Sequence, residues 1–309
     1  MDSIDTMSSP SPVTVTRIPR PDEPVPGLSL PGAAVFAAGI AILAASTALA
    51  LAGAWPWAAA VGVNAVACYL LFTVAHDASH HSLSSHEGVN VWLGRIATFL
   101  FAPQAGFRSW RFIHMQHHRF TNHDDGSDPD AYTMAGPSWQ RPLRWLTVDL
   151  QYVVFFMRYW KQRPRADKIE LLIQDLVVVA VIAASALTGH FVDLVLLVAL
   201  PQRLAIVWLA YAFDYLPHHG LHHKPSEDRL KTTRNRVGGE RVLSPLLLYQ
   251  NYHLVHHLHP IVPFYRYLAV WRRNEDRYLE GDPALSTVRG RPLTSDEYRE
   301  LRKLAAHEH

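Results

Sequence analysis

Three histidine motifs carry the chemistry of this 309-residue chain. The first, HDASH, places two imidazoles four residues apart, and this spacing puts both on one face of a helix. The other two, HMQHH and HLVHH, share the spacing i, i+3, i+4, so each presents three imidazoles on one side of a helix. Together the motifs supply eight nitrogen donors: His76 and His80, then His114, His117 and His118, then His253, His256 and His257.

Eight imidazoles are too many ligands for a single ion. A structural zinc takes four ligands and a catalytic zinc takes three plus water, so this donor set suits two metal ions. Neutral imidazole binds iron, copper, nickel and zinc, and the donors alone therefore do not name the metal. The single cysteine, Cys68, excludes a cysteine-based zinc site and an iron–sulfur cluster.

Long uncharged segments predict an integral membrane protein. Runs of this length are rare in water-soluble proteins, although buried helices of a soluble bundle are the alternative. Short turns separate the members of each pair, so the spans are expected to form two hairpins. The four predicted spans cover residues 33–55, 57–75, 171–187 and 191–213.

Basic residues set the expected orientation of these spans. Of the 29 Lys and Arg residues, two precede the first span, 11 lie between the second and third, and 15 follow Pro217. Neither hairpin turn contains one, so the positive-inside rule places both termini and the histidine motifs in the cytoplasm. The remaining basic residue, Arg203, lies inside the fourth span, where a charge marks a functional site or a short re-entrant helix.

The predicted fold class is all-α integral membrane, with four transmembrane helices and a cytoplasmic helical cap that carries the metal site. The membrane domain is expected over residues 33–271, between a disordered cytoplasmic tail over 1–32 and a cytoplasmic C-terminal tail over 272–309. Residues 89–102 and 145–160 are expected to lie as helices at the membrane surface. A redox metal at this boundary, iron above all, can activate O₂ against a lipid C–H bond. The net charge of +2 argues against nucleic-acid binding.

The combination of four spans with HxxxH, HxxHH and HxxHH resembles the integral-membrane fatty acid desaturase and hydroxylase superfamily, over roughly residues 58–267. Within it, HDASH, HMQHHRFTN followed by DPD, FDYLPH and QNYHLVHHLHPIVPFYRY look most like the cyanobacterial-type β-carotene hydroxylases. The resemblance implies two iron ions bound by the eight histidines, with O₂ as co-substrate. It adds His218, in FDYLPH, as a ninth ligand and Asp214 as a residue that contacts a metal through water.

Three polar residues adjoin the motifs, namely Asp77, Asn122 and Asn251. Metal-bound histidines usually donate their second ring N–H to an acceptor, so these side chains are expected to orient the rings. Two features leave the substrate open. The three-residue spacing in HDASH fits carotenoid-type and some bacterial lipid-acting members, whereas the long run HHGLHHKPSEDRLKTTRNR is richer in histidine than the carotenoid branch. Three histidines of that run have no assigned role: His219, His222 and His223.

The predicted function is O₂-dependent oxidation of a lipid C–H bond, with hydroxylation of a carotenoid ring as the first choice. Fatty acyl desaturation is the alternative, because a second hydrogen abstraction at the same site gives a double bond. A metal transporter or sensor is a distant alternative, since it predicts ionisable residues throughout the spans. The lipid is expected to enter from the bilayer along an apolar wall that includes Tyr69, Phe72, Trp208 and Tyr211, unless these residues only pack the helices.

Electrons are expected from a separate donor, such as a ferredoxin. Basic side chains that follow the fourth span would steer an acidic donor or attract anionic lipid headgroups. These side chains are Arg229, Lys231, Arg234, Arg236 and Arg241.

Overall fold

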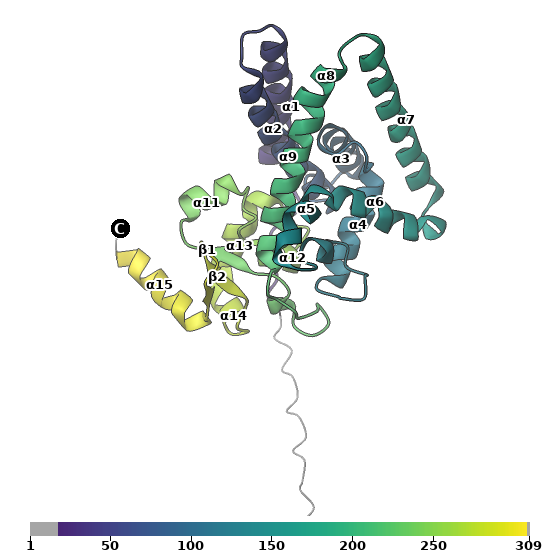
Figure 1. Cartoon of the computed structure of the whole chain (residues 1–309). Helices are drawn as coiled ribbons and strands as arrows, with labels where there is room; N and C mark the ends of the chain where they lie inside the picture. Colours follow the sequence, from purple (N-terminus) through teal and green to yellow (C-terminus); the bar gives the residue numbers. More distant parts are fainter. Residues whose placement is uncertain (1–17, 308–309) are drawn as a thin grey trace, which may run out of the picture.

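The computed structural model describes residues 18–307, and this part of the chain is mostly helical (Figure 1). The helices are α1 (Leu30–Leu51), α2 (Trp57–Ser79), α3 (Glu87–Phe101), α4 (Phe107–Phe120), α5 (Arg141–Leu146), α6 (Val148–Arg158), α7 (Arg165–Leu187), α8 (Phe191–Leu194), α9 (Leu200–Leu209), α10 (Leu216–His218), α11 (Glu240–Leu246), α12 (His253–Leu258), α13 (Tyr267–Arg273), α14 (Glu275–Leu279) and α15 (Ser295–His307). The strands are β1 (Asn235–Val237), β2 (Leu285–Thr287) and β3 (Pro292–Leu293).

Four helices are long and apolar enough to cross a membrane. They are Leu30–Leu51, Trp57–Ser79, Arg165–Leu187 and Phe191–His218. The first helix begins and ends earlier than the predicted span, and the third begins six residues earlier. The second and fourth run beyond the predicted spans, so α2 continues through His76 and the fourth ends at His218. The fourth is a composite of α8, α9 and α10 joined by two π-helical turns, η4 (Val195–Ala199) and η5 (Ala210–Tyr215).

Figure 1 shows α1 and α2 side by side, whereas α7 diverges from α8 and α9. The close approach of α1 to α2 depends on Gly39, because a Cβ atom at this position would lie 2.9 Å from the Leu71 side chain. The apolar window of α7 is not buried against the rest of the described chain. Its leucine and valine side chains are therefore left for the lipid of a membrane to cover.

Helices α3 and α6 occupy the segments that the sequence assigns to the membrane surface. Each is amphipathic, with buried residues on one face and large apolar side chains exposed on the other. Trp92 is 63% exposed on α3, and Leu150 and Met157 are more than half exposed on α6. This arrangement is typical of helices that lie in the interface plane.

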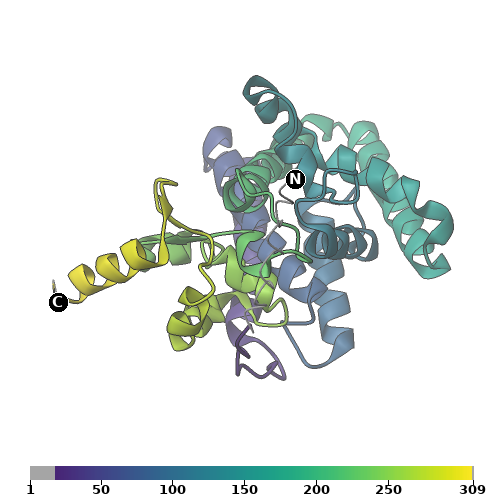
Figure 2. The ribbon, with the colours of Figure 1, turned by 90° about the horizontal axis from the view of Figure 1, so that it is seen from below.

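The C-terminal segment differs from the surface tail expected over residues 272–309. Trp271 stacks on Tyr278 with ring centroids 5.0 Å apart, and the Trp271 indole N–H donates to the Tyr298 hydroxyl at 3.0 Å. Strand β2 pairs in parallel with β1 and antiparallel with β3. This small sheet corrects the all-α expectation. Figures 1 and 2 show only α15 projecting from this region, on the side of the molecule opposite α7.

The N-terminal segment also differs from expectation over the residues that the structure describes. Glu23 forms an ion pair with Arg273 at 2.7 Å, and the Arg20 carbonyl accepts a hydrogen bond from the Asn274 amide. Residues 18–29 therefore lie against the cap instead of extending from it. The remainder of the expected tail, residues 1–17, lies outside the described residues.

Arg203 is compensated within a continuous helix. Its guanidinium donates to both carboxylate oxygens of Asp149 at 2.6 and 2.9 Å, and also to the Leu146 carbonyl at 2.6 Å. Gln104 donates to the same carboxylate at 2.6 Å. The charge thus joins α9 to α6, which explains its position without a re-entrant segment or a role in chemistry.

Replacing Arg203 with alanine leaves the Asp149 carboxylate without its cation, although only 7% of that side chain is exposed. We expect Arg203→Ala to lower the free energy of unfolding by about 2 kcal/mol, between the values for exposed and buried ion pairs. Thermal denaturation in detergent measures the loss. Arg299→Ala is the control, because Arg299 is bonded to the exposed Asp296. Equal shifts of the two midpoints would contradict the structural role of Arg203.

Candidate metal centre

Four helical elements bring the predicted ligands together. The end of α2 carries the first motif, α4 carries the second and α12 the third, while α10 adds His218. On α4 and α12 the i, i+3, i+4 spacing places each set of imidazoles on one side, as the sequence predicts. Side chains separated by up to 180 residues in the sequence thereby meet in one buried cluster.

The ring nitrogens form adjoining groups in which each residue offers one atom within 4.8 Å of the others. One group contains His76, His80, His114 and His256, and a second contains His117, His218, His253 and His257. His118 lies with His256 and His257, so it joins the two groups. All nine predicted ligands are therefore in one cluster with two four-histidine sites.

The distances inside the cluster fit bound metal. Nε2 atoms lie 2.8 Å apart in His80 and His114, and 3.1 Å apart in His76 and His256. Two nitrogens bound at about 2.1 Å to one ion lie about 3 Å apart when they meet at a right angle. His218 adds a further sign, because neither of its ring nitrogens has a hydrogen-bond partner within the described residues, although the residue is buried.

Burial keeps most of the imidazoles neutral and therefore able to bind metal. Among the imidazoles that lie outside the four apolar helices, it lowers the pKa values of six well below the usual histidine range, so their nitrogens carry lone pairs at neutral pH. These six are His80, His114, His118, His253, His256 and His257. Neutral rings with lone pairs directed at one another repel, and a cation between them removes that repulsion.

Acceptors behind the rings fix their tautomers. Nδ1–H of His253 donates to the Gln250 side-chain oxygen at 3.0 Å, and Nδ1 of His256 is hydrogen-bonded to the Tyr267 hydroxyl at 2.9 Å. Because the proton of His253 is then on Nδ1, its Nε2 lone pair faces the cluster. This is the arrangement that metal-bound histidines usually require.

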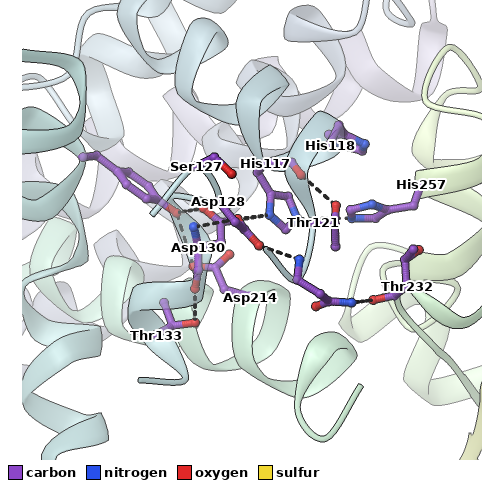
Figure 3. A network of polar contacts seen from close by, with 12 residues as sticks. His117, His118, Thr121, Ser127, Asp128, Asp130, Thr133, Asp214, Thr232 and His257 are labelled. Atoms are coloured by element: carbon purple, nitrogen blue, oxygen red, sulfur yellow. Dashed lines mark hydrogen bonds and ion pairs between the residues drawn. The ribbon is translucent and has the colours of Figure 1, made fainter. Parts of the chain in front are cut away.

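His117 has the strongest acceptors. Its Nδ1–H donates to Asp128 at 2.9 Å and lies 3.3 Å from Asp130 (Figure 3). Burial lowers the pKa of His117, but Asp130 and Asp128 together outweigh it and raise that pKa to about 9. The raised pKa favours a second proton on this ring at neutral pH in the metal-free protein, and a metal ion bound at Nε2 would take the place of that proton.

Further oxygen atoms, from Tyr152 and Asp214, lie next to the carboxylates that contact His117. The Tyr152 hydroxyl donates to Asp130 at 2.6 Å and lies 3.5 Å from Asp214. Asp130 comes from the loop after α4 and Asp214 from the π-helical turn η5, and Figure 3 shows both carboxylates on the same side of His117. Burial raises the pKa of Asp130 and of Tyr152. Asp214 thus lines the same cavity as His117 and His253, and its side chain accepts a hydrogen bond from the Tyr152 hydroxyl.

The expected ring partners are only partly correct. Asp77 lies 3.4 Å from Nδ1 of His76 and also accepts from the Phe264 amide. Asn122 donates instead to the carbonyls of His223 and Thr232, and Asn251 donates to a backbone carbonyl. Both asparagines hold loops rather than rings. The side chains that take their place are Asp128, Asp130, Gln250 and Tyr267.

Sequence spacing could have indicated some of these unpredicted hydrogen-bond partners of the rings. Gln250 precedes His253 by three residues, which brings the two side chains together at the start of α12. The DPD segment follows the second motif, but its contact with His117 depends on the loop folding back onto α4. Tyr267 comes from α13, and no local spacing predicts its contact.

An apolar cavity adjoins the metal centre. Its histidine lining comes from His76, His114, His117 and His253. Most of the rest is apolar and comes from α2, α3, α4, α6, α9 and the π-helical turn η5, including Phe72, Phe101, Trp110, Ile113, Phe156, Ile206, Leu209 and Phe213. Such a lining is typical of sites that bind apolar ligands.

Only Phe72 of the four predicted wall residues lines this cavity. Tyr69 packs against Leu209 and Phe213 and donates to a backbone carbonyl. Trp208 is 41% exposed, and Tyr211 packs against aromatic rings outside the cavity. These three residues therefore agree with the alternative, in which they only pack the helices.

The predicted basic surface is largely engaged in holding the cap together. Arg234 and Arg236 donate to backbone carbonyls and are more than half buried, and Lys231 pairs with Asp282 at 3.1 Å. The neighbouring His219 stacks on Tyr215. His219, His222 and His223 all lie outside the nitrogen groups found among the described residues.

The substitution Asp128→Asn tests whether the hydrogen bond to Asp128 orients His117 for metal binding. The substitution keeps the shape of the side chain and removes its charge, so the charge-assisted hydrogen bond is lost. We expect the affinity for divalent metal to fall about 10- to 100-fold, as measured by metal retention during dialysis against a chelator. Asp125→Asn is the control, since that carboxylate is exposed on the same loop. Equal retention in the two variants would contradict this role of Asp128.

Comparisons with known proteins agree with this geometry. A model of the fatty acid desaturase family matches residues 50–289. The chain is 31% identical to a β-carotene ketolase of Paracoccus sp. (strain N81106 / MBIC 01143), over 63% of this chain and 71% of the ketolase. It is 28% identical to the dihydrorhizobitoxine desaturase of Bradyrhizobium elkanii, over 76% of this chain and 72% of that enzyme.

A third relative acts on acyl lipids by its name. The sn-1 oleoyl-lipid 12-desaturase of Synechocystis sp. (strain ATCC 27184 / PCC 6803 / Kazusa) is 29% identical, over 63% of this chain and 61% of the desaturase. The family match covers far more than half of the 309 residues and includes every histidine of the cluster. The expected superfamily is thereby confirmed, and the chain is an oxidoreductase that belongs to the fatty acid desaturase family, whereas the closer likeness to β-carotene hydroxylases stays a prediction.

Proposed function

We propose that this protein is a di-iron enzyme that uses O₂ to oxidise a C–H bond of a membrane lipid. The observation that carries the proposal is the position of the two four-histidine groups, whose members line an apolar cavity. Imidazole donors suit iron, and the family to which the chain belongs uses two iron ions. A zinc site would need fewer ligands and offers no redox chemistry.

The protein's own residues then act in three ways. The two groups hold the metals, with His118 placed to serve both. Asp128, Gln250 and Tyr267 orient the rings through Nδ1, and burial of the site excludes water. The apolar wall holds a lipid carbon at the histidines, and this positioning decides which bond reacts. When bound, the iron pair supplies the activation of O₂.

The membrane arrangement is part of the proposal. The four apolar helices would cross the bilayer as two hairpins, within a domain over residues 33–271, with the histidine-bearing cap and both termini in the cytoplasm. The distribution of basic residues supports this orientation. The exposed apolar faces of α3 and α6 would lie at the cytoplasmic surface of the bilayer. An external protein such as a ferredoxin would supply the electrons.

Two substrate classes remain, and a specific relative supports each. Oxygenation of a carotenoid ring, hydroxylation first, is supported by the FDYLPH and QNYHLVHH segments and by likeness to a β-carotene ketolase. Desaturation of a fatty acyl chain is supported by likeness to acyl-lipid desaturases. The two reactions can use one site. They differ in how many hydrogens are removed and in where the lipid lies relative to the histidines.

Metal analysis tests the di-iron assignment. We expect the purified protein to contain about two irons per chain, since the donors form two groups. His117→Ala and His256→Ala each remove a ligand and are expected to lose iron and turnover together. His190→Ala is the control, because His190 lies in the turn before α8, 68% of its side chain is exposed and its ring hydrogen-bonds with Asp193. One zinc with intact turnover would contradict the proposal.

Expression in a host that makes β-carotene separates the substrate classes. Pigments and membrane fatty acids are analysed from the same cells. Ring oxygenation predicts zeaxanthin or cryptoxanthin with unchanged acyl chains. Desaturation predicts new double bonds in the acyl chains with unchanged pigment. The His256→Ala variant provides the background, and products that persist in it would come from the host rather than from this protein.

A further inference from the structure

Ser109 is a buried hydroxyl that the metal centre does not use. It lies in the first turn of α4 and lines the cavity, and only 2% of the residue is exposed. Its Oγ atom has no hydrogen-bond partner within the described part of the chain. Serine hydroxyls on helices commonly bond a carbonyl of the preceding turn, and no such bond is present here.

The other polar side chains on this part of the wall are already paired with protein groups. Gln104 donates to Asp149 at 2.6 Å, and Asp149 in turn accepts from Arg203. A buried hydroxyl without a partner carries the full cost of its lost hydration, and a ligand atom that bonds it recovers that cost. Ser109 therefore offers a hydrogen bond to whatever occupies the cavity.

The place of Ser109 on α4 fixes where that ligand atom lies. His114 and His117 follow it by five and eight residues and line the same cavity. With a rise of 1.5 Å per residue, these separations are about 8 and 12 Å along the helix axis. The wall between them is formed by the apolar side chains of Trp110 and Ile113. An atom bonded to Ser109 is thus several covalent bonds away from a carbon held at the histidines.

We propose that the Ser109 hydroxyl binds an oxygen atom of the lipid and selects substrates whose carbonyl or hydroxyl group is several bonds from the oxidised carbon. The inference rests on the proposed function, because it takes lipid oxidation at the histidines as given. An acyl chain held by an ester linkage meets the requirement. β-Carotene contains no oxygen, and a hydroxyl group next to a reacting ring carbon is too close to that carbon to reach Ser109.

The test compares an ester-linked lipid with its ether analogue. Iron-loaded full-length protein in nanodiscs receives phosphatidylglycerol with stearoyl or oleoyl chains, or the dialkyl ether form that lacks only the carbonyl oxygens, together with a ferredoxin, its reductase and NADPH. We expect kcat/KM to be about 3- to 10-fold higher for the ester lipid, which corresponds to one neutral hydrogen bond. Ser109→Ala is expected to remove this preference through KM and to spread the position of oxidation along the chain.

Three variants separate recognition from structure. Ser109→Ala deletes a hydroxyl with no protein partner, so its iron content and thermal midpoint are expected to match the wild type. Ser109→Thr keeps the hydroxyl and is expected to keep the preference. Ser286→Ala is the matched control, because Ser286 is also buried and unpartnered but lies on β2, outside the cavity lining.

Each result decides for or against the role of Ser109. Equal use of ester and ether lipids by the wild type overturns the inference while lipid oxidation itself stands. Oxidation of β-carotene alone, at equal rates in the wild type and in Ser109→Ala, has the same meaning. Oxidation of neither lipid class by iron-loaded protein overturns the proposed function, and the inference falls with it.

Discussion

The rest of this structure depends on one constraint, namely that imidazole nitrogens of different chain segments face one another in a buried site. Nε2 atoms of different chain segments lie about 3 Å apart, and burial keeps most of these rings neutral. Lone pairs held so close favour separation of the helices unless a cation lies between them. The surrounding packing must therefore hold the rings firmly, and the ends of α2, α4, α10 and α12 all converge on the cluster.

The side chains that orient the rings come from outside the three motifs and contact Nδ1, the ring nitrogen that points away from the cluster. Asp128 follows α4, Gln250 precedes α12 and Tyr267 begins α13, so three separate segments each fix one histidine through Nδ1. The cavity lies on another side of the cluster and is mostly apolar. One side of the histidine cluster is thus polar, while another side faces the cavity. Under the proposed function, this division would let changes in the cavity wall alter which lipid is oxidised without altering the histidines.

Local spacing predicted which histidines lie together because i, i+3 and i+4 on a short helix fix the direction of a side chain. The wall residues were harder to predict, since the π-helical turns η4 and η5 change which side chains of the fourth helix share a face. Trp208 and Tyr211 consequently point away from the cavity, whereas Phe213 lines it. The C-terminal segment has no apolar run, yet single aromatic residues such as Tyr278 anchor it. Hydropathy averages do not detect such isolated anchors.

The packing around α12 has a consequence for the order of events during biosynthesis. This helix has six residues and supplies ligands to both groups, so it is too short to be stable alone and relies on the cluster that contains Trp271, Tyr278 and Tyr298. Both histidine groups are therefore incomplete until the segment that follows α12 has also been made. The helices that carry the first two motifs are synthesised earlier, so under the proposed function iron would be acquired only after the C-terminal aromatic residues have packed against α12.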